Sequence, residues 1–504
     1  MLFPTYEFLV FFIITFTLGS FLKQRLIAYK YFLLFVNIIF YSFWSLQFLG
    51  LLVIDVIINY LIIQALIKTQ RNFFFLILGL LVNLIYLGFF KYYNFFCDSL
   101  QGLLETLKIP SDIQILQIIT PIGISFYTFR TISHLIDCYR NQLPNPKFLD
   151  YAVYITFFPQ IASGPIARAN GFYQQLNSYQ KSEYKIETVI ILIISGLFKK
   201  YTLSSFLFNF TQIPFKVPDN YTSIDLILAA IAYSCLIYVD FSGYSDLANA
   251  ISSLLGFQVV QNFNMPYRAQ SLQEFWRRWH ISLSEWLRDY LYIPLGGSHQ
   301  GKLRKHFNLL LTMVIGGFWH GAGVNFLIWG LLHGIGLIIN HIWKDTINKI
   351  QAIYQANIDN YNFQVFRFLG MSKKTFSNKY FLFNLKNFVL MCIPILFGVF
   401  TFTYVTLCWI FFTTSNLETA LNFLHQIINI DSHTTISSPF NNWRLYAVFI
   451  VVFIMNFYGD KINVFLEKIL EKNFFLQIVF VSSLLYVIFR LGPNTVPPFI
   501  YFNF

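Results

Sequence analysis

The chain contains few charged residues for its length. Asp, Glu, Lys and Arg make up 12% of its 504 residues, whereas hydrophobic residues make up 56%. A soluble domain usually carries about 25% charged residues, so this sequence cannot cover a water-soluble core of its size. We therefore predict a membrane protein. The chain also lacks Pro-, Gly- or Ser-rich linkers and repeats of fixed period, which favours a single membrane domain over residues 1–504.

Cysteine is scarce as well. The five cysteines have no CxxC or other paired spacing, and most of them lie within apolar runs. This pattern gives no disulfide framework and no metal site, and we expect no bound cofactor. Buried thiols are expected at Cys97, Cys138, Cys235, Cys392 and Cys408.

Apolar runs recur along almost the whole chain. A helix needs about 20 apolar residues to cross the hydrocarbon core of a membrane. Such runs lie near residues 8–22, 31–66, 72–90, 115–139, 151–165, 186–200, 223–256, 307–343, 386–413, 445–459 and 474–491. Some of them must hold two helices, so we predict an all-α polytopic membrane protein with roughly 11–13 membrane-crossing helices. The short alternating segments of a membrane β-barrel are missing.

The net charge of +12 suggests at first a nucleic-acid partner. The basic residues, however, lie in short loops between the apolar runs, which in a membrane protein sets the orientation and attracts anionic lipid. We therefore expect membrane lipids and no nucleic acid as partners. The positive-inside rule places residues 23–30 and 68–71 in the cytoplasm and the N-terminus outside.

Polar residues are concentrated in the middle of the chain. Ionisable groups at membrane depth cost about 2.5–3.5 kcal/mol each, so such clusters need partners or a cavity. We expect a functional core over residues 115–343, between packing helices at 1–110 and at 386–504.

The stretch from Ser271 to Tyr292 has apolar residues at steps of three and four, which predicts one amphipathic helix. Its charged faces and its tryptophans suit the membrane interface or the rim of a cavity. One interpretation is a surface helix without a chemical role. The other is a site for phosphate groups, because Arg277 and Arg278 carry guanidinium groups that grip phosphates.

The segment DFSGYSD places Asp240 and Asp246 around Gly243. The glycine and the serines suggest an interrupted helix, and paired carboxylates at membrane depth keep a transporter hypothesis open. The alternative is that these carboxylates cap helices or pair with Lys or Arg. Similar breaks are expected at Pro121, Gly123, Pro159, Gly164 and Pro165, which predict kinked or re-entrant segments.

His320 lies in the charge-free run GGFWHGAGVNFLIWGLLHG, residues 316–334. Burial disfavours the charged imidazolium, so the ring should be neutral, as a general base must be. The surrounding glycines allow close helix packing or the access of a thin substrate. His333 could not share a site with His320 on one continuous helix, because the two lie about 140° apart around its axis. His280 could approach only from another element.

The sequence resembles the membrane-bound O-acyltransferase family, and most closely its bacterial polysaccharide branch. The resemblance rests on FWRRWHISLSEWLRDYLYIPLGG, GGFWHGAGVNFLIWGLLHG, PIGISFYTFRTISHLID, FFPQIASGPIAR, GLFKK, DFSGYSDLA and PFIYFNF, and it extends from about residue 115 onward. It implies a funnel-like helical bundle with re-entrant and interfacial helices. It also implies that His320 is the catalytic histidine and His280 a second functional one. One departure is YTLSSF after GLFKK, where relatives often have an acidic residue.

The resemblance implies an O-acetyltransferase of the bacterial inner membrane that takes acetyl from cytoplasmic acetyl-CoA. The acceptor would be a cell-envelope polysaccharide such as peptidoglycan or an alginate-like polymer, reached through an extracytoplasmic serine-dependent O-acetyltransferase partner. Transfer of D-alanine to a cell-wall polymer, a transporter or flippase, and an inert scaffold for polymer export are the alternatives. Beside the two histidines, we expect substrate or donor contacts from Arg277, Arg278, Trp279, Asp289, Tyr292, Trp319, Asn325, Asp240, Ser242 and Tyr244.

Overall fold

The computed structural model describes residues 3–109, 116, 118–178, 185–369, 379–429, 438–471, 474–493 and 497–503. Over these ranges the chain is helical, with turns and loops but no strand. The predicted all-α fold is therefore confirmed.

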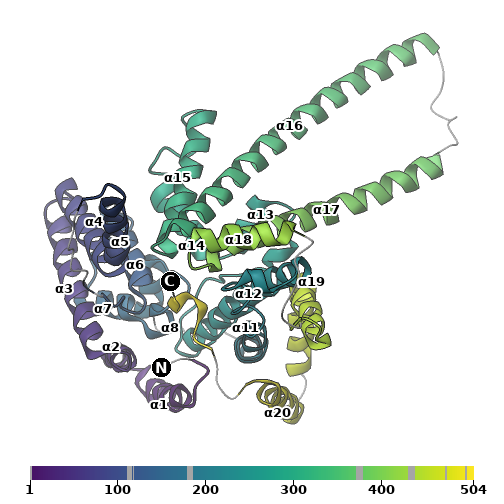
Figure 1. Ribbon diagram of the computed structural model, residues 1–504. Helices are drawn as coiled ribbons and strands as arrows, with labels where there is room; N and C mark the ends of the chain where they lie inside the picture. The colour runs from purple at the N-terminus through teal and green to yellow at the C-terminus, as the bar shows by residue number, and fades with distance from the viewer. Residues whose placement is uncertain are drawn as a thin grey trace.

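The N-terminal helices line one side of the molecule (Figure 1). They are α1 (Tyr6–Leu22), α2 (Leu26–Ser42), α3 (Leu46–Lys68), α4 (Phe73–Leu87), the π-helix η1 (Gly88–Tyr92) and α5 (Tyr93–Thr106). Their apolar sequences form helices with polar side chains at the starts, where Ser45 and Asn72 accept hydrogen bonds from backbone N–H groups of α3 and α4.

The middle of the chain forms shorter elements around one long helix. They are α6 (Ile124–Tyr139), α7 (Phe148–Thr156), α8 (Phe158–Ile161), α9 (Ala169–Asn177), α10 (Ile186–Leu197), η2 (Phe198–Ser204), α11 (Ser205–Phe208), η3 (Pro218–Asn220), α12 (Ser223–Leu254), η4 (Pro266–Arg268), α13 (Leu272–Arg278), α14 (Ile281–Leu287) and η5 (Arg288–Tyr292). Helix α12 begins with a capping box between Thr222 and Asp225 and is buried along most of its length.

The C-terminal third contains the longest helices. They are α15 (Lys302–His320), α16 (Val324–Leu369), α17 (Lys379–Thr413), α18 (Leu417–Ile428), α19 (Trp443–Leu470), α20 (Phe474–Leu491) and the short η6 (Ile500–Asn503). In Figure 1, α16 and α17 extend as two long arms away from the bundle, and the segment with η6 returns to its centre.

Seven helices of the described residues are long and apolar enough to cross a membrane, and three shorter apolar helices accompany them. The protein is thus a multi-pass membrane protein. These ten helices are fewer than the 11–13 crossings predicted. The difference arises because apolar runs such as 151–165 form short buried helices, α7 and α8, that pack inside the bundle.

The predicted breaks at Pro and Gly residues lie where the chain turns inside the protein. Gly123 precedes α6 with a φ of +78°, and a Cβ there would lie 2.2 Å from the carbonyl oxygen of Ile161. Only glycine fits this close approach between the start of α6 and α8. The start of α6 is therefore fixed against a buried, irregular segment of the chain.

Helix α12 runs without a break through Asp240 and Asp246, so the predicted interruption is wrong. Gly243 instead allows η2 to pack closely, because a Cβ there would lie 2.9 Å from the Lys200 backbone nitrogen. The two carboxylates pair with neighbouring lysines of η2, at 2.5 Å for Lys200–Asp240 and 2.7 Å for Lys199–Asp246. Asp240 also accepts bonds from Ser204 and from the backbone N–H of Ile500. This arrangement is the alternative we considered, in which the carboxylates serve as partners for lysine.

Three of the cysteines are buried free thiols, as predicted, and Cys97 is partly exposed. The side chain of Cys392 lies outside the described residues.

Replacing Lys200 with Met should destabilise the protein by about 3–5 kcal/mol, because the Asp240 carboxylate would stay buried without its cation. The free energy of unfolding in mixed micelles measures the loss. The matched control is Lys185→Met, which removes the exposed Lys185–Glu471 pair and should change stability very little. Equal losses in the two variants would contradict a structural role for the buried pair.

Candidate functional site

His280 lies in a break between two helices. Instead of the single helix predicted over 271–292, α13 ends at Arg278 and α14 begins at Ile281, and His280 adopts a left-handed conformation with a φ of +42°. Asn262 stabilises the break by accepting bonds from the backbone N–H groups of Ile281 and Ser282. The break turns the fully buried His280 ring toward the protein interior, and the periodic sequence pattern gave no sign of it.

His320 is the last residue of α15, and the chain reverses through Gly321–Gly323 into α16. The glycines in this region allow the two helices to touch, since a Cβ on Gly317 would lie 2.3 Å from the Phe326 carbonyl oxygen. His320 and His333 are therefore not on one helix. Their rings both contact Trp329, with centroids at 5.1 Å and 4.7 Å.

The two predicted catalytic histidines meet around a shared set of aromatic rings. The Trp319 ring lies 4.8 Å from His320 and 6.4 Å from His280. Tyr501, from the C-terminal segment, lies 5.6 Å from His320 and 6.5 Å from His280. Neither ring nitrogen of His280, nor Nδ1 of His320, has a hydrogen-bond partner within the described part of the chain.

A cavity of about 70 Å³ lies at this point. Its walls come from η1, from the start of α6, from the end of α15 and from the C-terminal segment. They include Lys91, Gly123, Ser125, Phe126, Trp319, His320 and Tyr501. Trp319 and His320 are the predicted site residues among them, whereas His280 does not line this cavity and its ring is stacked at 6.5 Å from Phe126.

Lys91 and Tyr92 of η1 cap the end of α15. The Lys91 ammonium donates to the carbonyl oxygens of Trp319 and His320 at 2.6 Å and 3.1 Å. The Tyr92 hydroxyl donates to the carbonyl oxygen of Phe318 at 2.9 Å. The final carbonyls of a helix have no partner within the helix, and here side chains of η1 satisfy three of them in a row.

The cavity lies at the start of α6, at the end of α15 and beside η1, within the helical span Phe73–Thr106. Helix α15 starts at Lys302 and reaches His320 after about 27 Å at 1.5 Å per residue. Helix α4 and η1 cover a similar length from Arg71 to Lys91, and α6 runs from the cavity to Arg140. Arg71 bonds to the Cys138 carbonyl oxygen, so the basic ends of α4 and α6 lie together, far from His320.

A second, larger cavity of about 520 Å³ opens toward that basic end, along α15. Basic side chains line one part of it, and Leu309, Met313 and Trp276 line its deeper part. Trp276 donates to His333 Nδ1 at 3.3 Å, and Trp329 separates His333 from His320. The basic residues are Arg277, Arg288, Lys305 and His341, and of the predicted residues Arg277 and Tyr292 line this cavity.

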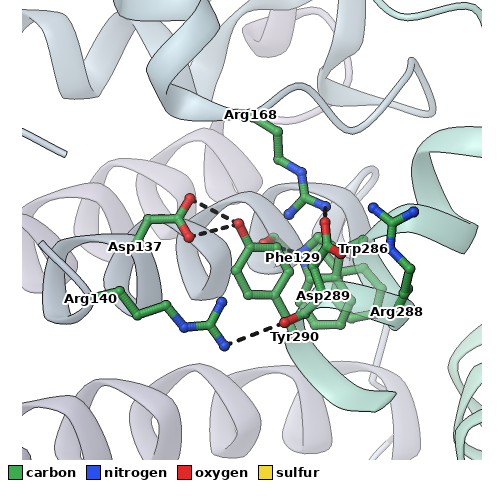
Figure 2. Close-up of polar contacts among 8 residues, drawn as sticks. All are labelled: Phe129, Asp137, Arg140, Arg168, Trp286, Arg288, Asp289 and Tyr290. Carbon is green, nitrogen blue, oxygen red and sulfur yellow. Dashed lines mark hydrogen bonds and ion pairs between the residues drawn. The ribbon is translucent and has the colours of Figure 1, made fainter. Parts of the chain in front are cut away.

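Beside this mouth lies a cluster of charged residues (Figure 2). The Asp289 carboxylate accepts bonds from Arg168 at 2.9 Å and from Arg288 at 2.7 Å, and it raises the pKa of the Arg288 guanidinium. The Tyr290 hydroxyl donates to both Asp137 oxygens at 2.8 Å, and the Arg168 guanidinium lies 4.4 Å from the Tyr290 ring. Asp289 is thus a partner for arginines at the mouth, not a wall of the His320 cavity.

The remaining predicted residues lie away from both cavities or hold structure in place. Arg278 pairs with Glu274 at 2.9 Å, and the buried Asn325 side chain donates to the Thr414 carbonyl oxygen. Trp279 packs against Phe275 and Trp409, and Tyr244 stacks on Phe499. Ser242 and Asp246 line a separate cavity between α10, α12, α19 and α20.

Sequence reasoning identified only Trp319 and His320 among the residues that line the cavity, and the polar side chains that it missed include Lys91, Ser125 and Tyr501. One signal was available, because Lys91 is an isolated ionisable residue in the apolar run FFKYYNFF, and such residues are rare inside membranes unless they serve a function. Among the described residues no three His, Cys, Asp or Glu side chains are gathered closely enough to hold a metal.

Comparison with known proteins gives a consistent match. Residues 76–383 match the family model described as MBOAT, membrane-bound O-acyltransferase family. The match begins before residue 115, where we placed the start of the resemblance, and it includes Lys91. The peptidoglycan O-acetyltransferase of Helicobacter pylori is 34% identical over 447 residues, which cover 82% of this chain and 76% of that protein.

Two further relatives match over shorter lengths. The probable alginate O-acetylase AlgI of Azotobacter vinelandii is 41% identical over 312 residues, covering 61% of this chain and 62% of that protein. The teichoic acid D-alanyltransferase of Streptococcus thermophilus is 31% identical over 245 residues, covering 45% of this chain and 59% of that protein. The chain thus matches less than two thirds of the length of these two relatives.

Replacing Tyr290 with Phe should destabilise the protein by about 1–3 kcal/mol, because the largely buried Asp137 carboxylate would lose its hydroxyl donor. Thermal and denaturant unfolding measure this. Tyr292→Phe, two residues along the same π-helix, is the control and should leave stability unchanged, since the Tyr292 hydroxyl makes no hydrogen bond to the described residues. No difference between the two variants would contradict the importance of the Tyr290–Asp137 bond.

Proposed function

The chain belongs to the membrane-bound O-acyltransferase family, and we propose that it moves acetyl groups from cytoplasmic acetyl-CoA across the bacterial inner membrane. The acetyl group would modify a cell-envelope polysaccharide, either peptidoglycan or an alginate-like polymer. Family membership makes the protein an O-acyltransferase. The donor, the acceptor and the direction of transfer are our inferences.

The observation that carries the proposal is the position of His320. This buried imidazole lines a small cavity where α15 ends, while the larger cavity with basic walls lies along α15 toward its start. Basic loops face the cytoplasm in membrane proteins, so the basic end would meet a cytoplasmic donor and the His320 end an external acceptor. An enzyme that takes a donor from the cytoplasm and serves an acceptor outside needs access to its site from both sides of the membrane.

The chemistry follows from a neutral base near a thioester. The His320 imidazole removes the proton of an acceptor hydroxyl as its oxygen attacks the acetyl carbonyl carbon. The carbon–sulfur bond then breaks, and the leaving thiolate takes the proton from the imidazolium. The products are an acetate ester and free coenzyme A. His280 shares the aromatic cage with His320 but does not line the cavity, and we assign it to positioning the Phe126 and Trp319 rings of the cavity wall.

The larger cavity supports a nucleotide-bearing donor. Arg277, Arg288 and Lys305 provide cationic groups at its walls, and the apolar walls run inward along α15 as far as Met313. Guanidinium groups form bidentate hydrogen bonds with phosphates, and the mixed polar and apolar walls suit a pantetheine arm. We therefore place the phosphates of coenzyme A among these side chains.

The acceptor side of the proposal rests on the relatives. A peptidoglycan O-acetyltransferase and a probable alginate O-acetylase are among the proteins similar to this chain. We infer a partner outside the cytoplasm with a catalytic serine, which receives the acetyl group and delivers it to the polysaccharide. D-alanine transfer is the second candidate, favoured by the similarity to a teichoic acid D-alanyltransferase.

The first test is thioester turnover by the purified full chain in lipid nanodiscs. The wild type should release free thiol from acetyl-CoA, and His320→Ala should lower the rate by about 100-fold or more, because general-base catalysis typically contributes 10²–10⁴-fold. His299→Ala is the control, since this histidine is exposed and lies outside both cavities. Unchanged turnover in His320→Ala would rule out the proposed base, and release of thiol from D-alanyl thioesters alone would favour the second candidate.

The second test concerns the donor phosphates. Arg277→Ala should raise the KM for acetyl-CoA about tenfold with little change in kcat, because it removes binding that is equal in the ground and transition states. Its neighbour Arg278, which pairs with Glu274 and lies outside the cavity, provides the matched control, and Arg278→Ala should keep the wild-type KM. If both variants behave alike, the donor phosphates do not lie in this cavity.

A further inference from the structure

Lys91 is a partly buried cation without a carboxylate partner among the described residues. Its ammonium group makes three hydrogen bonds, to the carbonyl oxygens of Trp319 and His320 and to Ser125 Oγ at 3.2 Å. All three acceptors are neutral, and no Asp or Glu pairs with Lys91 among the described residues. A charge in such a place is costly unless it is used. The positive field is therefore directed at the cavity that Lys91 lines together with His320.

The position of Lys91 depends on η1. The π-helix inserts a wider turn into the helix that begins at Phe73, and such turns frequently occur at functional sites. It directs both Lys91 and Tyr92 toward the end of α15. Because the carbonyl end of a helix carries partial negative charge, the ammonium is favoured there. The same contact fixes the backbone of His320.

Ser125 connects this cation to the open space of the cavity. Its Oγ accepts the Lys91 bond, so its own proton remains available to another acceptor, and the residue lines the cavity wall. Ser125 lies in the first turn of α6, whose positive end also faces the cavity. A hydroxyl that accepts a bond from an ammonium becomes a stronger donor, because hydrogen bonds in a chain polarise one another.

We propose that Ser125 is a catalytic residue that donates its hydroxyl proton in a hydrogen bond to the acetyl carbonyl oxygen, and that Lys91 is the positioning residue that polarises Ser125. This inference rests on the proposed acetyl transfer and adds the group that stabilises its oxyanion. When the acceptor oxygen bonds to the carbonyl carbon, the π electrons move to the carbonyl oxygen. The Ser125 hydroxyl and the field of Lys91 meet this negative charge. As the charge returns, the carbon–sulfur bond breaks and the thiolate is protonated by His320.

The test uses steady-state thioester turnover by the full chain in nanodiscs. Ser125→Ala should lower kcat about 100-fold with little change in KM, as expected for loss of one oxyanion donor. Ser133→Ala is the matched control, because Ser133 lies on the same helix, is also buried, and only bonds to the Arg130 carbonyl oxygen. It should keep wild-type kcat. Ser125→Thr, which retains a hydroxyl, should recover part of the rate.

The pairing of the two residues is tested by a double-mutant cycle. Lys91→Met should lower kcat by about as much as Ser125→Ala, and the double variant should be no slower than Lys91→Met alone, since residues that act as a unit are not additive. If the two substitutions lowered kcat by independent factors that multiply in the double variant, the proposed coupling between Lys91 and Ser125 would be overturned. Tyr92→Phe controls for simple loosening of α15, and an equal loss of kcat in that variant would assign Lys91 a structural role only.

The outcomes separate this inference from the proposed function. If the wild type releases no thiol from any acyl-CoA or D-alanyl thioester, the proposed function fails. If the wild type is active and Ser125→Ala keeps its kcat while the protein elutes as a single species, the oxyanion role is wrong. A stable acetyl adduct on Ser125, detected by mass spectrometry, would also overturn it, because the hydroxyl would then be a nucleophile.

Discussion

The site depends on how a helix can end inside a membrane protein. Away from water, each free carbonyl group needs a partner from the protein itself. Helix α15 ends at His320 in the protein interior, and the side chains of Lys91 and Tyr92 satisfy its last carbonyl groups. Without these contacts the helix would have to continue, and His320 would lie on a regular helix face. The π-turn of η1 is thus what allows the imidazole to stand at the edge of a cavity.

The two cavities offer two different chemical environments. The larger one has cationic walls and a mouth where arginines and carboxylates alternate. The smaller one is lined by aromatic and imidazole rings and by the partly buried Lys91 ammonium. Phosphates are stabilised in the first environment, whereas a neutral base and a developing oxyanion suit the second. Trp276, which lines the larger cavity, contacts Trp329, whose ring also contacts His320 of the smaller one.

Much of the fold could be predicted from the sequence, and the apolar runs identified the membrane helices correctly as a class. The histidine pair could be named because His280 and His320 lie in long, specific motifs. The helix break at His280 could not, because an amphipathic repeat runs unbroken across it. The turn is stabilised by Asn262 and Asn264, which lie before both helices in the sequence. Likewise, DFSGYSD looked like a broken helix, since the sequence does not show that the lysines of η2 would pair with its carboxylates.

The walls of the His320 cavity come from segments around residues 91, 125, 320 and 501. Contacts between residues so distant in the sequence form slowly, because long loops must close first. The individual helices can be inserted and even packed while this chamber is still open. Membrane insertion and helix content therefore do not report whether the His320 cavity has formed. A population of chains can have native helix content while the cavity is complete in only a fraction of the molecules.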